Sequence, residues 1–216
     1  MKMIEINSLP KLERYLNGIK IVVFDLDDTL YDEIDYVKSG FLCVAQVLRN
    51  VENAFERLYE LFKQGERPID KLLEEENIVS EEIKTECLRA YRTQIPNISL
   101  SDDVRDLLNR LKKSGYRLGV ITDGRVEGQK AKIKALGLDN LIDKIIITDE
   151  LGGIEYRKPN PKAFEMMRDF FDVKFEEMCY IGDNISKDFA APDMLGMKSI
   201  LYKNPNGLYF KVRLKC

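Results

Sequence analysis

The stretch Ile21-Val-Val-Phe-Asp-Leu-Asp-Asp-Thr-Leu30 decides the fold of this chain. Its four leading apolar residues are typical of a β-strand that is buried on both faces, as in a parallel sheet. The run ends in three acids, Asp25, Asp27 and Asp28. Carboxylates there are costly unless they are paired or bind a metal, and ligands of open α/β sheets bind at that end of the strands. A strand that merely runs into an acidic turn is the simpler alternative.

The composition is that of a globular protein: 216 residues, 44% hydrophobic, 33% charged, with a formal net charge of −3. This balance gives no support to nucleic-acid binding. Histidine is absent, which excludes histidine-based triads and zinc sites and leaves acid–base chemistry to carboxylates, Lys, Tyr or Cys. The four cysteines are irregularly spaced and are expected to be free thiols.

We expect a cytoplasmic protein that does not contact a membrane. The start of the chain lacks the apolar region of a secretion signal. No apolar run approaches the ~20 residues that a membrane span requires. The sequence leaves the oligomeric state open.

Strands and helices alternate along most of the chain. After the first strand, at about 19–25, strands are expected at 116–122, 145–147, 178–181 and 199–202. Helices are expected from Ser101 to Gly115 and over 126–136, 161–171 and 186–195. This alternation predicts the α/β class, with a Rossmann-like, doubly wound parallel sheet. Residues 1–18 are expected to be a lead-in with a short helix over 11–16, and alternating apolar residues over 208–214 favour a further edge strand.

Between the first two expected strands, apolar residues recur at helical spacing and no strand pattern interrupts them. We therefore predict a small all-helical domain over residues 31–98. Residues 1–30 and 99–216 would then form the Rossmann-like core.

Polar residues follow the strands of this core at four places. They are Asp25 with Asp27, Thr122-Asp123-Gly124, Lys158 in a loop with two prolines, and Asp183 with Asp188. Because the carboxyl ends of parallel strands share one edge of a sheet, these four groups are expected to meet.

The chemistry of these groups fits phosphoryl transfer. Carboxylates such as Asp25, Asp27 and Asp183 are hard oxygen ligands that suit Mg²⁺. The Thr122 hydroxyl and the turn at Gly124 suit an anion, and Lys158 supplies a positive charge for a phosphate group. A carboxylate nucleophile in such surroundings suggests an aspartyl-phosphate intermediate.

The four motifs resemble those of the haloacid dehalogenase superfamily, most of whose members are Mg²⁺-dependent phosphatases. Residues 25–30 match its first motif, 121–123 the second, Lys158-Pro159 the third and 182–188 the fourth. The helical insertion after the first motif resembles the caps that close over the site in this superfamily.

The resemblance implies a role for each residue. Asp25 would attack the phosphorus, and Asp27 would protonate the leaving oxygen and then activate water. Thr122 and Lys158, with the turn Asp123-Gly124, would hold the phosphoryl oxygens. The metal would bind to Asp25, the backbone carbonyl of Asp27 and Asp183. Asp188 would be either a ligand or a support for Lys158.

The expected function is Mg²⁺-dependent hydrolysis of a small phosphorylated metabolite, such as a sugar phosphate or a nucleotide monophosphate. A phosphomutase shares all four motifs and stays an alternative. A haloacid dehalogenase fits less well, because it needs the nucleophilic aspartate but neither the metal nor Asp27. A binding module without catalysis is the remaining alternative, although no catalytic position is missing.

Overall fold

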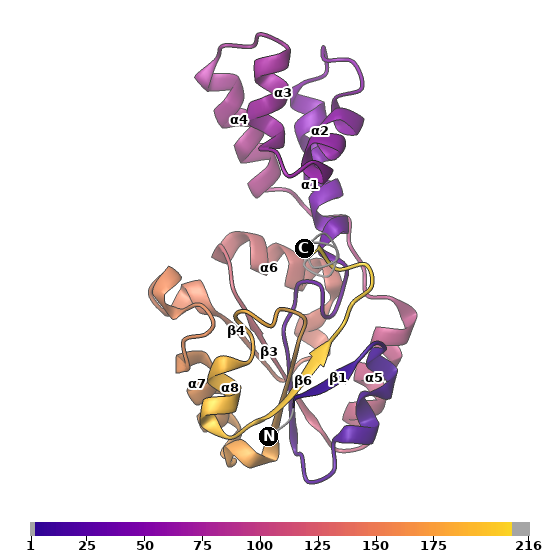
Figure 1. The fold of residues 1–216 in the computed structure, drawn as a ribbon, viewed down its shortest axis with the longest axis vertical. Helices are drawn as coiled ribbons and strands as arrows, with labels where there is room; N and C mark the ends of the chain where they lie inside the picture. Colours follow the sequence, from indigo (N-terminus) through magenta and orange to yellow (C-terminus); the bar gives the residue numbers. More distant parts are fainter. Residues whose placement is uncertain (1–2, 209–216) are drawn as a thin grey trace. The chain divides into compact units, whose positions relative to one another are not determined.

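The computed structural model describes residues 3–208. They form a six-stranded parallel sheet with the strand order β1-β6-β5-β2-β3-β4 (Figure 1). The strands are β1 (Ile4–Ile6), β2 (Ile21–Phe24), β3 (Arg117–Thr122), β4 (Lys144–Ile147), β5 (Met178–Gly182) and β6 (Lys198–Tyr202). All four residues of β2 are buried between β5 and β3, because this central strand is covered on both faces. The predicted Rossmann-like α/β fold is confirmed.

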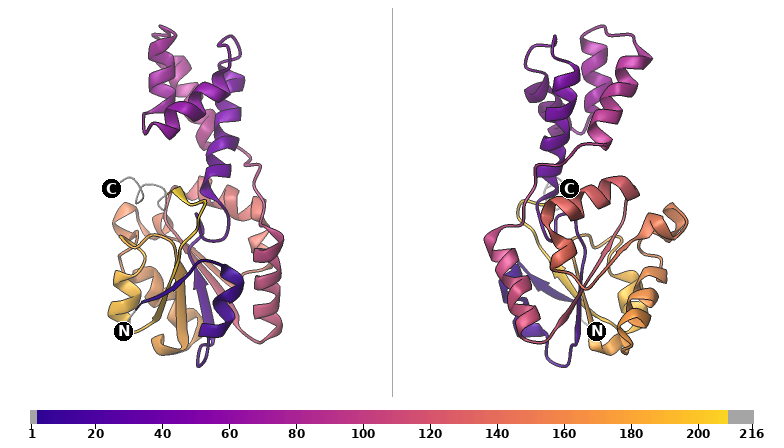
Figure 2. Two further views of the ribbon diagram at one scale, coloured as in Figure 1. Left: turned by 45° about the vertical axis from the view of Figure 1, so that its right-hand side comes forward. Right: turned by 180° about the vertical axis from the view of Figure 1, so that it is seen from behind.

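Helices cover both faces of this sheet, with α5 and the 3₁₀ helix η1 on one side and α7 and α8 on the other (Figure 2). Ser101 caps α5 by accepting a hydrogen bond from the amide of Val104 at 3.4 Å, as its position predicts. The bounds are η1 (Leu9–Tyr15), α5 (Asp102–Lys113), α6 (Val126–Leu136), α7 (Lys162–Phe171) and α8 (Ala190–Leu195), with short 3₁₀ turns at Leu138–Asn140, Thr148–Leu151, Ile154–Tyr156 and Phe175–Glu177.

Two sequence-based expectations for this unit are wrong. The lead-in contains an edge strand, β1, whose three residues include a single buried side chain, Ile6, too short a pattern to recognise. The helix expected over 186–195 begins only at Ala190. The Asn184 side chain instead accepts hydrogen bonds from the amide and the hydroxyl of Ser186 at 3.0 and 2.6 Å, which holds this segment in a turn. The edge strand expected over 208–214 lies, beyond Leu208, outside the described residues.

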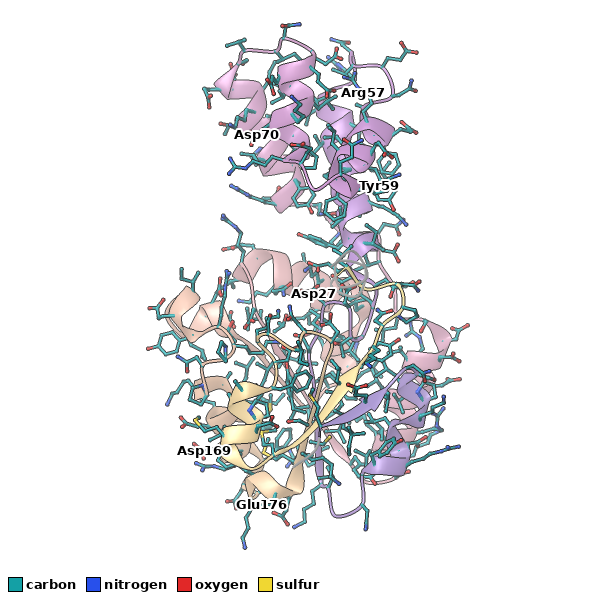
Figure 3. All side chains as sticks on the ribbon, viewed as in Figure 1. Asp27, Arg57, Tyr59, Asp70, Asp169 and Glu176 are labelled. Atoms are coloured by element: carbon teal, nitrogen blue, oxygen red, sulfur yellow. The ribbon has the colours of Figure 1, made fainter. Side chains whose placement is uncertain are left out.

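The chain divides into two compact units, and residues Ile34–Ile98 form the second. The regular elements of this unit are all helices, and within it Ser80 caps α4 (Glu81–Arg92) by accepting a hydrogen bond from the amide of Ile83 at 3.3 Å. Arg57 joins α2 to the end of α3 through Glu75 at 2.9 Å (Figure 3). That this unit serves as a cap stays a prediction. The helices are α1 (Glu33–Val47), α2 (Ala54–Lys63), α3 (Pro68–Glu75) and α4 (Glu81–Arg92).

Among residues 3–208, no helix has the length and apolar character needed to cross a membrane. The expected cytoplasmic location and the expected absence of nucleic-acid partners stay predictions.

Candidate active site

The connections that follow β2, β3, β4 and β5 bring the four sequence motifs together. Asp25 follows β2, and its amide donates a hydrogen bond to the carbonyl of Ile181 on β5 at 2.8 Å. Asp27 therefore lies at the end of the sheet opposite to Glu176, which precedes β5 (Figure 3). This is the edge at which ligands of open α/β sheets bind.

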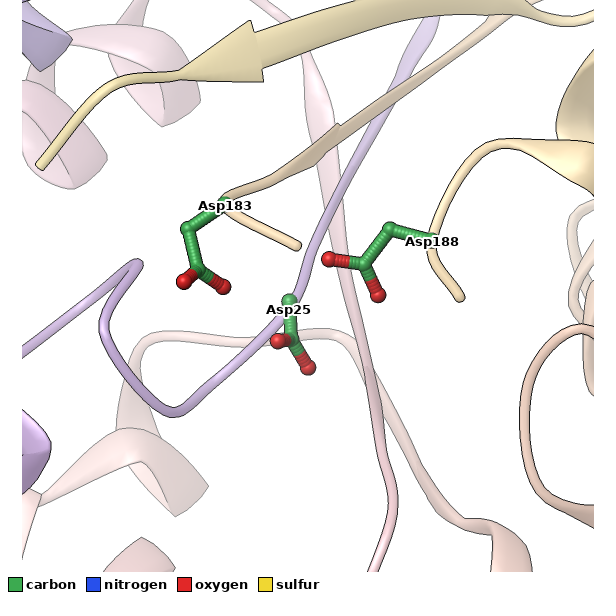
Figure 4. A group of neighbouring side chains, drawn as sticks. All are labelled: Asp25, Asp183 and Asp188. Carbon is green, nitrogen blue, oxygen red and sulfur yellow. The ribbon is translucent and has the colours of Figure 1, made fainter. Parts of the chain in front are cut away.

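Three carboxylates converge at this edge. Asp25, Asp183 and Asp188 each offer an oxygen atom, and these atoms all lie within 4.8 Å of one another (Figure 4). Burial and the negative charges of Asp25 and Asp188 raise the pKa of Asp183 to about 8. Burial also raises the pKa of Asp25, to about 6, although Lys158 opposes the rise. Such crowded carboxylates favour a cation among them, and their hard oxygen atoms fit a divalent ion such as Mg²⁺.

Lys158 pairs with two of these carboxylates, and its side chain has no exposed surface. Its ammonium nitrogen lies 2.6 Å from Oδ1 of Asp25, 2.8 Å from Oδ1 of Asp188 and 2.8 Å from the hydroxyl of Tyr180. Burial disfavours the charged amine, but Asp188 and Asp25 outweigh it and hold the pKa of Lys158 well above its usual value. Lys158 therefore fixes the positions of two carboxylates as a permanent cation.

Asp188 is held from two sides. Besides Lys158, the amide of Asn184 donates a hydrogen bond to its Oδ2 at 2.9 Å. The backbone passes close by, because a Cβ atom on Gly182 would lie 2.4 Å from the same oxygen. Asp188 thus both supports Lys158 and faces the carboxylate group, so neither of its two expected roles excludes the other.

Among the described residues, Asp27 does not belong to the cluster of three carboxylates. Its own carboxylate has other partners. Tyr31 and Lys132 donate hydrogen bonds to its Oδ1 at 2.5 and 2.7 Å, and Gln129 donates one to its Oδ2 at 3.0 Å. Burial disfavours ionisation, but the Lys132 charge and these hydrogen bonds hold the pKa of Asp27 below its usual value. The expected metal contact through the backbone carbonyl of Asp27 stays a prediction.

The second motif, at the end of β3, is held by Gln129 and by the loop after β4. Gln129 on α6 places its amide nitrogen 2.6 Å from Oγ1 of Thr122 and 2.7 Å from the carbonyl of Asp123. The Asp123 carboxylate accepts hydrogen bonds from the Thr148 hydroxyl at 2.9 Å and from the Lys158 amide at 3.1 Å. Asp123 thus ties the loops after β3 and β4 together, and its expected contact with phosphate, like those of Thr122 and Gly124, stays a prediction.

A cleft of about 320 Å³ opens over these residues. Its volume suits a small molecule, and every residue that lines it has an ionisable side chain. It is lined by Asp25, Asp27, Glu33, Asp123, Arg157, Lys158, Asp183 and Lys187.

Several residues of this site are not among the candidates expected from the sequence; they include Gln129, Lys132, Tyr180 and Lys187. A signal existed for two of them, because Gln129 and Lys132 occupy the first two of the positions 129, 132, 133 and 136, which form the buried stripe of α6. A polar pair on such a stripe indicates a buried polar partner. Tyr180 lies inside an apolar strand and Lys187 in a polar loop, where neither residue stands out.

Comparison with known proteins places the chain in a group of related hydrolases. Residues 22–202 match the haloacid dehalogenase-like hydrolase family. The glyceraldehyde 3-phosphate phosphatase of Pyrococcus abyssi is 30% identical over 200 residues, which cover 86% of this chain and 82% of that protein. The human N-acylneuraminate-9-phosphatase is 24% identical over 216 residues, covering 89% of this chain and 86% of that protein.

A solved structure has the same fold. It is a hydrolase of this type from Bacillus subtilis bound to magnesium, with a TM-score of 0.63 and 18% identity. The match covers 85% of this chain and 86% of that chain.

Proposed function

The chain belongs to the haloacid dehalogenase-like hydrolase family, as a hydrolase of the phosphatase type, and we propose that it hydrolyses a phosphorylated sugar through an aspartyl-phosphate on Asp25. The observation that carries the proposal is the buried Asp25 carboxylate, held 2.6 Å from Lys158 at the base of a charged cleft. The two curated relatives named above are a glyceraldehyde 3-phosphate phosphatase and an N-acylneuraminate-9-phosphatase, and these names support a phosphorylated sugar as the substrate. A cleft of about 320 Å³ has room for the phosphoryl end of such a substrate.

In the first step, a carboxylate oxygen of Asp25 attacks the phosphorus and the bond from phosphorus to the leaving oxygen breaks. Lys158 keeps this oxygen nucleophile in place through its 2.6 Å contact. For this step Asp27 must carry a proton, although its contacts with Lys132, Tyr31 and Gln129 favour the ionised form. It gives this proton to the leaving alkoxide, and the proton taken from water in the second step restores it. The product alcohol leaves, and the phosphoryl group stays on Asp25.

In the second step, a water molecule attacks the phosphorus of the aspartyl-phosphate. Asp27, now ionised, takes a proton from this water. The bond between phosphorus and the Asp25 oxygen breaks, inorganic phosphate leaves and Asp25 is a carboxylate again. Lys132, Tyr31 and Gln129 favour the ionised form of Asp27, which is the form that this step requires.

Asp25, Asp183 and Asp188 would hold the divalent ion, with the carbonyl of Asp27 as a further ligand. Their crowding supports this assignment, because the charges of Asp25 and Asp188 add to burial in raising the pKa of Asp183 to about 8. When bound, Mg²⁺ would neutralise charge on the phosphoryl oxygens and on the carboxylates around them.

The helical unit of residues 34–98 would act as a cap. It follows the nucleophile in the chain and has its own core, so it can move as one body. A cap that closes after substrate enters would exclude water from the first step and would supply contacts to the sugar.

The alternatives differ in what they require of Asp27. A dehalogenase releases a halide, which needs no proton. The three hydrogen bonds that hold the Asp27 carboxylate would then not contribute to proton transfer to the leaving group. A phosphomutase remains an alternative, because it would use the same groups to return the phosphoryl group to the sugar.

The test is hydrolysis of an aryl phosphate and of glyceraldehyde 3-phosphate, with and without Mg²⁺, by the natural chain and by Asp25→Asn. We expect metal-dependent release of phosphate that the variant loses. Hydrolysis that persists in the variant would exclude the covalent route. Net conversion between phosphorylated isomers, without release of phosphate, would favour the mutase.

A further inference from the structure

Lys158 has three ammonium protons and three acceptors within hydrogen-bond distance. These are Asp25, Asp188 and the Tyr180 hydroxyl, at 2.6, 2.8 and 2.8 Å. The side chain of Lys158 is 0% exposed. Its protons therefore all have acceptors within the protein, and a phosphoryl group in the cleft would have to displace one of these contacts in order to bind Lys158.

Two further cations line the cleft within residues 3–208, and they differ in how firmly they are held. Arg157 makes a bidentate pair with Asp149, with both contacts at 2.7 Å. These two contacts hold its guanidinium against another residue of the protein. Lys187 makes a single ion pair with Oδ2 of Asp123 at 3.6 Å, and 30% of its side chain is exposed. Lys187 thus has the looser contact of the two, although the Arg157 side chain is the more exposed, at 38%.

The position of Lys187 suits an anion. It lies between Asp183 and Asp188 in the chain, in the turn that follows β5, and it lines the same cleft as Asp25. A lysine ammonium is a compact charge that a flexible stem can direct to a phosphate oxygen without a fixed geometry.

We propose that Lys187 binds the transferring phosphoryl group, whereas Lys158 positions the carboxylates. This inference rests on the proposed phosphatase function and divides between two lysines the role expected of Lys158 alone. On binding, the Lys187 ammonium would leave Asp123 and donate hydrogen bonds to the phosphoryl oxygens of the substrate, and afterwards to those of inorganic phosphate.

The test uses inorganic phosphate as the probe, in the presence of Mg²⁺. Calorimetry gives the dissociation constant of phosphate, and kinetics with an aryl phosphate give KM, kcat and the Mg²⁺ concentration for half-maximal rate. The variants are Lys187→Gln and Lys187→Arg. Lys130→Gln is the matched control, because it removes the same charge from an exposed residue of α6 that is paired with Glu150.

Lys187→Gln is expected to weaken phosphate binding and to raise KM by about 10- to 100-fold, the usual effect of losing a charge-assisted hydrogen bond. The half-saturating Mg²⁺ concentration should stay the same or fall, because removing a cation beside carboxylates does not weaken metal binding. Lys187→Arg keeps the charge and should restore most of the affinity. Lys130→Gln should leave all four quantities unchanged.

An unchanged affinity for phosphate in Lys187→Gln would overturn the inference, even if this variant unfolded at a lower temperature. A loss of activity that added Mg²⁺ fully restores would also overturn it, because Lys187 would then act on the metal site. If the natural chain bound phosphate through Lys187 but hydrolysed no phosphate ester, the inference would stand and the proposed function would fail.

Discussion

Lys132 and Asp27 are 105 residues apart in the sequence, yet the Lys132 ammonium lies 2.7 Å from Oδ1 of Asp27. Both side chains are largely buried, with 7% and 17% exposed. The contact joins α6 to the loop that carries the nucleophile. It directs the Asp27 carboxylate, together with Tyr31 and Gln129, and it stabilises that carboxylate as an anion.

Lys132→Gln is therefore expected to lower kcat for an aryl phosphate by about 10- to 100-fold. This is a part of the rate enhancement that a general acid–base group usually provides. KM should change little, because Lys132 does not line the cleft. Steady-state kinetics below the unfolding temperature of the variant would measure both. Lys134→Gln, at an exposed position of the same helix, is the control. A kcat that matches that of the control would contradict the role of Lys132 in positioning Asp27.

Asp25→Asn is expected to reduce turnover by at least about a thousandfold, because it removes the nucleophile. The fold should persist, since asparagine has the same shape and its amide oxygen can still accept a hydrogen bond from Lys158. Circular dichroism would check the fold, and release of phosphate would measure the rate. Turnover close to that of the natural chain would point to direct attack by water.

Asp183→Asn and Asp188→Asn separate the two roles expected of Asp188. Asp183→Asn should raise the Mg²⁺ concentration for half-maximal rate at least about tenfold. It should not lower the stability of the metal-free protein, because the raised pKa of Asp183 means that its ionised form is disfavoured in the folded state.

Asp188→Asn should in addition destabilise the metal-free protein by about 3 kcal/mol, because it breaks the buried pair with Lys158. Thermal unfolding of both variants in a chelator, beside the Mg²⁺ dependence of their rates, would show the difference. Equal unfolding temperatures would mean that the pair with Lys158 does not stabilise the fold.

Gly182→Ala tests the close approach at the end of β5. The added methyl group would lie 2.4 Å from Oδ2 of Asp188, so Asp188 would have to shift. We expect a loss of about 1–3 kcal/mol in the free energy of unfolding, as for other overpacked sites. We also expect weaker binding of Mg²⁺, seen as a higher Mg²⁺ concentration for half-maximal rate. Chemical denaturation and metal titration would measure these effects. A variant with natural stability would show that Asp188 moves without cost.

The cap proposal predicts that specificity travels with residues 34–98. Replacing this segment by the helical unit of a relative with a different substrate should change the order of preference among phosphorylated sugars. The rate with a small aryl phosphate should change less, because the catalytic groups are in the other unit. An unchanged order of preference would refute the proposal.

The sequence determined the central strand, the class of fold and the main candidates for the site. The apolar run of β2 has no stable place except between two other strands. Once the strands are parallel, one edge of the sheet carries the acids after β2, the turn at Thr122, Lys158 and the acids after β5. The order of the elements along the chain is enough to place these groups together.

Only the tertiary structure decided how these groups share their contacts. Lys158 was recognisable as a cation of the site, but its three acceptors come from three places: the loop after β2, strand β5 and the turn before α8. Lys132, Gln129 and Lys187 gain their roles in the same way, through neighbours distant in the chain. A side chain's partners depend on distances between elements, which packing sets to within an ångström and which no local pattern of residues encodes.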